Sequence, residues 1–327
     1  MEVVVGAGRG EGGSRRRVVR VGGARAPPPF HLLGDNMPNP PAVAVDVFDL
    51  PRLPSPVKAY YGDVIQDPAE WAKRCVEECQ PDLIALHLIS TGPALGGRSP
   101  REAAKTVEDV LQAVDVPIII GGSGNKESDP HVLAEAAEVA DGERCILNSA
   151  SLDMDYGRVA DAALKHGHIV LSWTPLSVEL QRRLNRELML LNLPREQIIM
   201  DPTTAPLGYG MEYSVDVVER IRLRAFQGDE LLQMPILSGS SNAWGAREAR
   251  LPEPSWGPLE FRGPLWEAVN ALIMVAAGCD LLLMMHPQAV RLFRRMMKRL
   301  RPTPEREPAL GDSLSWVYEE LRGGEAP

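Results

Sequence analysis

The chain has 327 residues, 44% of them hydrophobic, and a formal net charge of −9 at pH 7. This length and composition can fill either two ordinary domains or one large barrel core. The acidic balance, with no face rich in Lys and Arg, argues against binding to nucleic acid, which requires basic residues to neutralise phosphates.

The sequence shows no sign of a membrane-spanning or secreted protein. No apolar run reaches the roughly 18 residues that a spanning helix requires. Asp280 interrupts the nearest run, which covers residues 271–285. Residues 1–5 are too short and too acidic for a secretory signal. We therefore expect a soluble, cytoplasmic protein.

The four cysteines do not form a pattern typical of a metal site. Cys75 and Cys79 lie one helical turn apart, whereas Cys145 and Cys279 are isolated. Zinc and iron–sulfur sites usually show two tight cysteine clusters or a mixed Cys/His cluster. We interpret these thiols as reduced and mostly buried.

Residues 1–41 differ from the rest of the chain and are expected to form an N-terminal extension. The segment 6–14 is rich in glycine and is predicted to be flexible, and prolines concentrate at 27–29 and 38–41. Residues 18–21 suit one edge of a small hairpin.

From residue 42 onward, a short apolar run, a polar or glycine-rich loop and an amphipathic helix follow one another repeatedly. Continuous apolar runs of this length are typical of parallel strands that are buried on both faces. The eight runs cover residues 42–48, 83–88, 116–120, 144–148, 169–173, 198–200, 235–238 and 280–285.

Capping signals mark the helices between these runs. Ser99, Pro100 and Glu102 form a capping-box pattern, and Ser128 with Pro130 marks another helix start. We expect helices at residues 99–114, from 128 onward, and at 153–165, 177–191, 212–226, 264–277 and 287–300.

Eight strand–helix units in strict alternation predict a single (β/α)8 TIM barrel, an α/β fold, over residues 42–302. An open, doubly wound sheet of eight strands is the alternative that this pattern leaves open. Within a C-terminal tail of residues 303–327, the segment 310–321 predicts an extra helix packed outside the barrel.

Ligand chemistry is expected where the strands end, because barrel enzymes place their functional groups at the carboxyl ends of their strands. The residues there are small, polar and mostly uncharged, which suits a large polar ligand held by many hydrogen bonds. The sequence lacks a nucleophile elbow, a Lys that ends a strand and a His–His–carboxylate set, so we predict no catalytic residue and no metal site. The candidate ligand-binding residues are Gly122, Ser123, Asn125, Asn148, Ser149, Trp173, Asp201, Thr203, Ser240, Asn242 and His286.

Asp201 is the most informative carboxylate among these candidates. It suits either a buried acid that binds or protonates a ring nitrogen, or a cap for local backbone amides. Trp173 could stack on a flat ligand or pack at the rim of the barrel. His286 is a candidate for contact with the ligand. His87 lies inside a strand and is interpreted as a core histidine.

Two local motifs resemble cofactor signatures but fail in detail. Residues 121–125 form a glycine-rich loop, yet Glu127 occupies the third glycine position of the dinucleotide-binding fingerprint. Asp129 and His131 match a signature that supplies a histidine ligand to cobalt, except that Ala134 replaces its closing glycine. Since this segment opens a helix, we interpret Asp129 as a helix cap.

Several longer stretches resemble one protein family. They are residues 201–213, 256–258, 262–268 and 285–287, together with 37–41 before the first strand. These stretches are similar to the small subunit of the corrinoid iron–sulfur protein, whose archaeal counterpart is the delta subunit of the acetyl-CoA decarbonylase/synthase complex. The resemblance extends from about residue 15 to about residue 300, and residues 1–16 have no counterpart in it.

The resemblance implies a barrel in the reductive acetyl-CoA (Wood–Ljungdahl) pathway, where a corrinoid carries a methyl group from methyltetrahydrofolate to acetyl-CoA synthase. It implies a heterodimer with a large subunit that carries the iron–sulfur cluster and the cobalamin-binding domain, so that this chain holds no cluster. The corrinoid is then shared at the interface and faces the barrel rim. Methyltetrahydrofolate methyltransferase and acetyl-CoA synthase are implied as transient partners.

Two other functions stay open at this point. A methyltetrahydrofolate–corrinoid methyltransferase, a related barrel, would hold its pterin with strand-end residues such as Asp201 and Asn148. A zinc-dependent thiol methyltransferase would need adjacent cysteines at a strand end, whereas Cys279 precedes the last strand. We therefore favour a binding subunit that supports methyl transfer without bond chemistry of its own.

Overall fold

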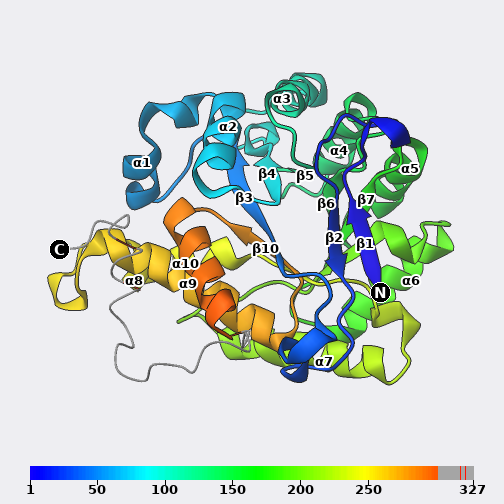
Figure 1. The fold of residues 1–327 in the computed structure, drawn as a ribbon. Coiled ribbons are helices and arrows are strands. Elements are labelled where there is room, and N and C mark those ends of the chain that lie inside the picture. Colours follow the sequence, from blue (N-terminus) through cyan, green and yellow to red (C-terminus); the bar gives the residue numbers. More distant parts are fainter. Residues whose placement is uncertain (301–316, 318–320, 322–327) are drawn as a thin grey trace.

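The computed structural model describes residues 1–300, Val317 and Leu321, and its centre is a barrel of parallel strands ringed by helices (Figure 1). The strand order is β8, β7, β6, β5, β4, β3, β10 and β9, and a parallel bridge between Met200 and Ile236 joins the two ends of this series. The strands are β3 (Ala42–Phe48), β4 (Leu83–His87), β5 (Ile118–Gly121), β6 (Ile146–Ala150), β7 (Ile169–Trp173), β8 (Ile198–Asp201), β9 (Leu237–Ser238) and β10 (Leu281–Met284).

Each of the eight apolar runs contains a strand, so the predicted TIM barrel is confirmed and the open-sheet alternative is wrong. β3 and β7 occupy the predicted ranges, whereas β9 keeps only two residues of its predicted run. Because the parallel ladders close on themselves, none of the long strands is left as an exposed edge.

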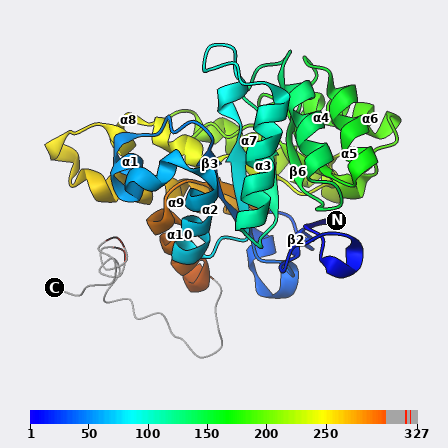
Figure 2. The same cartoon turned by 90° about the horizontal axis from the view of Figure 1, so that it is seen from above.

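Helices connect successive strands and cover the outside of the barrel (Figures 1 and 2). The predicted capping box is present: the Ser99 side chain accepts from the Glu102 amide, and the Glu102 side chain accepts from the Ser99 amide. The helices are α1 (Ser55–Tyr61), α2 (Pro68–Cys79), α3 (Pro100–Ala113), α4 (Asp129–Val139), α5 (Tyr156–His166), α6 (Val178–Leu190), α7 (Met211–Phe226), α8 (Arg247–Arg250), α9 (Leu259–Ala277) and α10 (Pro287–Leu300).

Two helices begin elsewhere than predicted. α5 begins at Tyr156, because Asp155 rather than an earlier residue caps it by accepting a hydrogen bond from the Arg158 amide. α9 begins at Leu259 and contains Pro264, which was predicted to start it. Pro264 lies in the second turn of α9, and the helix continues through it although the proline donates no backbone hydrogen bond.

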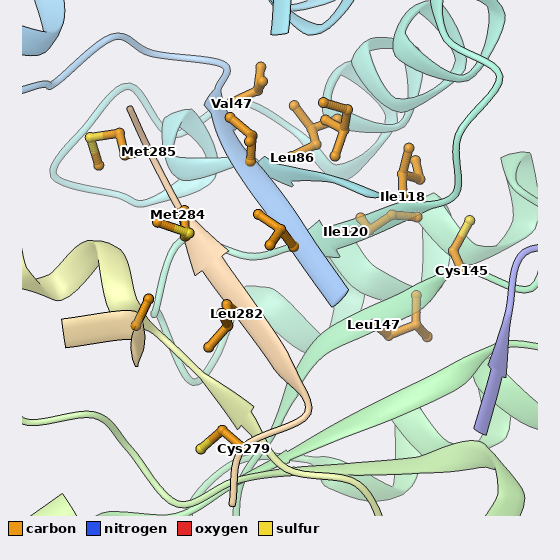
Figure 3. Close-up of a cluster of buried hydrophobic side chains, with 14 of the residues drawn as sticks. Val47, Leu86, Ile118, Ile120, Cys145, Leu147, Cys279, Leu282, Met284 and Met285 are labelled. Carbon is orange, nitrogen blue, oxygen red and sulfur yellow. The ribbon is translucent and has the colours of Figure 1, made fainter. Parts of the chain in front are cut away.

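The strands are buried on both faces, as their continuous apolar sequence predicts. Alternate residues such as Val47, Leu86 and Ile120 point outward and pack beneath the helices (Figure 3). The residues between them, including Ala44 and Ala85, form a separate cluster inside the barrel. The period of two therefore divides the core into an outer and an inner part.

An antiparallel hairpin of β1 (Glu2–Val5) and β2 (Val19–Gly22) covers the end of the barrel where the strands begin, below the strands in Figure 2. Val3, Val5 and Val21 are fully buried and belong to the inner cluster. The predicted hairpin is confirmed. The flexibility of residues 6–14 stays a prediction.

Arg15, just before β2, ties this extension to the barrel. Its guanidinium donates to the backbone carbonyls of Leu111 and Val114 at the end of α3, and it pairs with Glu143 at 2.7 Å. These carbonyls have no partner within the helix, so a buried arginine satisfies them.

The helix predicted at 310–321 lies outside the described residues, apart from Val317 and Leu321. In the part of the chain that is described, no helix is long and apolar enough to cross a membrane.

Candidate functional site

A cleft of about 580 Å³ lies at the mouth of the barrel, where the strands end. Small-molecule sites typically enclose roughly 300–1,000 Å³, so the cleft has room for a ligand or for one part of a larger one. Hydroxyl, amide and carboxylate side chains dominate its lining, with Phe48, Trp173 and Leu283 among the apolar contributors.

Strand alternation determines which side chains reach this cleft. Each strand-end residue of the lining lies two positions after a residue of the inner core, and it therefore points the same way and forms the top layer of the barrel interior. These pairs are Ala44 and Asp46, Ala85 and His87, Ile146 and Asn148, Leu171 and Trp173, and Ile199 and Asp201.

Most of the predicted candidates come together in the cleft, although no ligand contact is shown for any of them. Those that line it are Gly122, Ser123, Asn125, Asn148, Ser149, Trp173, Asp201 and Asn242. Thr203, Ser240 and His286 do not line it.

Alternation also explains two of these absences. Ser240 and His286 follow the inward-facing positions 239 and 285 by one residue, so they face away from the cleft, and both are buried. Thr203 follows the strand end, where a φ of 65° turns the chain, and its Oγ1 donates to the Thr174 carbonyl at 2.8 Å.

Asp46, which lies near the end of the first predicted strand, and His87, which was interpreted as a core histidine, both line the cleft although neither is among the candidate ligand-binding residues. Nε2 of His87 lies 2.9 Å from Oδ1 of Asp46, and its ring stacks on Phe48 with centroids 4.7 Å apart. Asp46 is only 2% exposed, whereas His87 opens to the cleft. Counting in steps of two from Ala85 would have revealed His87 as inward-facing.

The glycine-rich loop after β5 is held by Asp129, the first residue of α4. The Asp129 carboxylate accepts hydrogen bonds from the Ser123 amide at 2.9 Å, the Ser123 hydroxyl at 2.8 Å and the Gly124 amide at 2.7 Å. Asp129 therefore caps this loop and not its own helix, which corrects the prediction. A side chain at Gly122 would collide with the carboxylate, since a Cβ there would lie 2.5 Å from it.

Asp201 has a strongly perturbed carboxyl group at the inner end of the cleft. Burial raises the pKa of Asp201 from 3.8 to about 7, and a hydrogen bond from the Thr203 amide at 2.8 Å opposes this rise in part. The carboxyl group therefore exchanges a proton near neutral pH.

His286 lies behind the cleft, in contact with the rings of Tyr60 and Trp244. Burial lowers the pKa of its imidazole to about 3, so it is neutral. Glu267 accepts hydrogen bonds from Trp244 Nε1 at 2.9 Å and from the backbone amides of Met285 and His286. This network supports the end of β10.

All four cysteines are free and buried, as interpreted from their spacing. Burial raises the pKa of Cys79 and Cys145 to about 12, so these thiols stay protonated at neutral pH. Within residues 1–300, 317 and 321, no group of three or more His, Cys, Asp or Glu side chains is arranged to hold a metal ion.

Comparison with known proteins places this barrel in a family. The model of the family described as the CO dehydrogenase/acetyl-CoA synthase delta subunit matches residues 2–282. The chain belongs to this delta-subunit family. Because the match begins at residue 2, the expectation that residues 1–16 have no counterpart in the family is wrong.

Curated relatives of the delta-subunit family are similar over nearly the whole chain. The acetyl-CoA decarbonylase/synthase complex subunit delta 1 of Methanosarcina thermophila is 50% identical, covering 98% of this chain and 74% of the relative. The delta subunit of Methanocaldococcus jannaschii is 46% identical over 97% of this chain and 78% of the relative.

Solved structures similar to this delta-family barrel include two dihydropteroate synthases. The enzyme of Thermus thermophilus has a TM-score of 0.54 at 17% identity, over 80% of this chain and 93% of that one. The enzyme of Xanthomonas albilineans has a TM-score of 0.56 at 16% identity, over 81% and 95%. At these identities the likeness shows the fold alone.

Proposed function

We propose that this chain is the barrel subunit of a corrinoid iron–sulfur protein and that its mouth forms one wall of the corrinoid site. It acts in the cytoplasm as a heterodimer with a large subunit that carries the iron–sulfur cluster and the cobalamin-binding domain. Methyltetrahydrofolate methyltransferase and acetyl-CoA synthase are its transient partners. Family membership supports this role, because the relatives are complex subunits by name.

The observation that carries the proposal is the chemistry of the cleft lining. A corrin ring carries carboxamides around its edge, and these groups both donate and accept hydrogen bonds. Asn148 and Ser149 provide an amide and a hydroxyl at the mouth, Asn242 provides an amide oxygen while its Nδ2 donates to the Thr204 carbonyl, and Trp173 provides a flat apolar face. These residues fit the periphery of a corrinoid, which itself supplies the cobalt that carries the methyl group.

The size of the cleft supports a shared site. At about 580 Å³ the cleft can take an edge of a corrin ring but cannot enclose the whole cofactor. The remaining surface of the ring then lies against another chain. On this proposal the barrel binds and orients the corrinoid and limits the access of water to one face.

Asp201 is the residue of this proposed corrinoid-binding surface whose protonation affects hydrogen bonding. With its pKa raised to about 7, it can hold a proton at the cleft near neutral pH. In the neutral form it donates a hydrogen bond that an ordinary ionised aspartate does not offer.

A second candidate function is binding of a pterin, as in a methyltetrahydrofolate–corrinoid methyltransferase. The observation that favours it is that Asp201 and Asn148 face the same cleft. In addition, dihydropteroate synthases of the same fold have been solved with a pterin–sulfa conjugate and with 7,8-dihydropteroate. The hydroxyl and amide groups of the lining suit the corrinoid equally well.

Co-expression with the large subunit tests the proposal. We expect a 1:1 heterodimer whose affinity for a corrinoid, measured by absorption titration, falls about tenfold when Trp173→Ala and Asn242→Ala are combined, since an aromatic contact and a hydrogen bond are lost. Leu190→Ala, on the exposed outer surface of α6, is the control and should leave the affinity unchanged.

Isothermal calorimetry with methyltetrahydrofolate separates the two candidates. We expect no binding to the isolated chain at micromolar concentrations. Tight pterin binding, or purification of the chain alone as an active methyltransferase dimer, would overturn the corrinoid-subunit proposal in favour of the second one.

A further inference from the structure

Three residues lie in register on neighbouring strands at the mouth of the barrel. His87 of β4 pairs with Gly121 of β5, and Gly121 pairs with Asn148 of β6. The side chains of His87 and Asn148 point into the top layer on either side of a residue that has no side chain. The side chains of His87 and Asn148 can therefore approach each other above Gly121.

The space above Gly121 shows how close they come. A Cβ at this position would lie 2.9 Å from Nδ1 of His87 and 3.4 Å from Nδ2 of Asn148. Contacts of 2.9 Å are not tolerated by real Cβ atoms, so the imidazole occupies its place only because residue 121 is glycine. Both polar atoms thus face one small area of the cleft.

Asp46 determines what His87 offers to a ligand. Nε2 of His87 donates to the Asp46 carboxylate at 2.9 Å, and in this tautomer Nδ1 is the acceptor of the ring. Among the residues that the structure describes, none forms a hydrogen bond with this Nδ1 or with the side-chain amide of Asn148. An acceptor and a donor therefore stand beside each other without a protein partner.

We propose that His87 and Asn148 form a subsite for a primary carboxamide of the bound ligand. The carboxamide N–H donates to Nδ1 of His87, and its carbonyl accepts from Nδ2 of Asn148. Asp46 is a positioning residue, because it acts through the tautomer and orientation of His87. This inference rests on the proposed function, since the carboxamides are those at the edge of the corrinoid.

The test compares two corrinoids that differ at these groups. Aquocobinamide keeps its primary carboxamides, whereas cobyrinic acid has carboxylates in their place. The apo heterodimer is titrated with each, and dissociation constants are measured by absorption. We expect the heterodimer to prefer cobinamide, because an ionised carboxylate cannot donate to Nδ1 of His87.

Two variants of the subsite carry the test. Asn148→Ala removes the donor, and Gly121→Ala places a methyl group against Nδ1 of His87. Each should weaken cobinamide binding about tenfold, as expected for one lost hydrogen bond. Gly121→Ala should change cobyrinic acid binding by less than about twofold, whereas Asn148→Ala should weaken it as well, because a carboxylate also accepts from Nδ2 of Asn148. Gly245→Ala, whose Cβ would meet nothing within 4 Å, is the matched control and should bind both corrinoids as the wild type does.

Asp46 is tested by rescue. Asp46→Leu should reduce the preference for cobinamide, and Asp46→Asn should restore much of it, because an amide oxygen can still accept from Nε2. A merely structural role predicts equal losses for both corrinoids. Far-ultraviolet circular dichroism establishes that each variant is folded.

The outcomes separate the inference from the proposed function. If the wild-type heterodimer binds no corrinoid more tightly than the large subunit alone, the proposed function fails, and the inference with it. If it does bind more tightly, but the folded variants lose no cobinamide affinity, or Gly121→Ala weakens both ligands equally, only the carboxamide subsite is overturned. Tetrahydrofolate binding that Asn148→Ala abolishes would assign the pair to a pterin and also overturn it.

Discussion

Asp201 shows how one buried carboxyl group couples the stability of the barrel to pH. The unfolded chain releases this proton near pH 4, whereas burial lets the folded chain keep it up to about pH 7. Between these values the folded state binds more protons than the unfolded state. The free energy of unfolding therefore contains a contribution that is lost as the pH rises from about 4 to about 7.

We predict that Asp201→Asn removes this pH dependence. Each unit of pKa corresponds to about 1.4 kcal/mol, so wild type should lose up to about 4 kcal/mol relative to the variant across that range. Urea unfolding at a series of pH values measures the difference. Glu127→Gln, at an exposed position on the neighbouring loop, should follow the wild-type profile. Parallel profiles for wild type and Asp201→Asn would contradict the prediction.

The cleft could be predicted from the sequence only in part, and the reason lies at the level of single residues. Strand ends correctly indicated Asn148, Trp173 and Asp201, because an apolar run ends visibly in sequence. Whether a strand-end residue points inward depends on which face of the strand it occupies. Ser240 and His286 are buried outside the cleft for this reason. The Asp46–His87 pair joins two strands, and a single sequence does not show such a pairing.

The loop that joins β5 to α4 illustrates how a helix start can organise a binding loop. Asp129 begins α4, yet its carboxylate points back and accepts three hydrogen bonds from Ser123 and Gly124. Because it is 6% exposed, these bonds are shielded from water. The loop is thereby fixed to the rigid barrel and not left to fluctuate beside the cleft.

We predict that Asp129→Ala frees this loop. Hydrogen bonds to a charged group contribute about 1.5–3 kcal/mol each, so the amides of Ser123 and Gly124 should exchange with solvent at least about tenfold faster. Hydrogen–deuterium exchange with mass spectrometry measures this rate. Glu138→Ala, on the exposed face of the same helix, should leave the exchange unchanged. Unaltered exchange in Asp129→Ala would show that other contacts hold the loop.

At the level of elements, the sequence predicted the barrel well because each strand is an apolar run between helices with readable caps. Helix starts were less certain. Pro264 resembles a first-turn proline, yet α9 begins five residues earlier. The residues before Pro264 belong to the helix because they also pack on the barrel. The hairpin was predicted only as an edge, since pairing of β1 with β2 across 13 intervening residues leaves no local signal.

The whole molecule depends on the hairpin as a second source of core residues. The barrel alone leaves the inner cluster open where its strands begin, and Val3, Val5 and Val21 complete that cluster. Each of these side chains is fully buried, and burying one valine is worth about 1.5–3 kcal/mol. The N-terminal extension is therefore part of the folded domain.

We predict that Val3→Asp destabilises the whole barrel. An unpaired carboxylate would enter an apolar cluster with no partner, at a cost of at least about 3 kcal/mol in the free energy of unfolding. Thermal unfolding followed by circular dichroism measures the loss. Val18→Asp, at a position that is 44% exposed just before β2, should change the midpoint little. Similar midpoints for the two variants would show that the hairpin is not part of the cooperative core.

The hairpin also makes the two ends of the barrel different. Val3, Val5 and Val21 close the barrel where its strands begin, and the cleft lies at the opposite end, at the mouth. On the proposed function, the large subunit docks over that mouth and covers the cleft. A corrinoid held between the two chains is then expected to leave no faster than the chains separate.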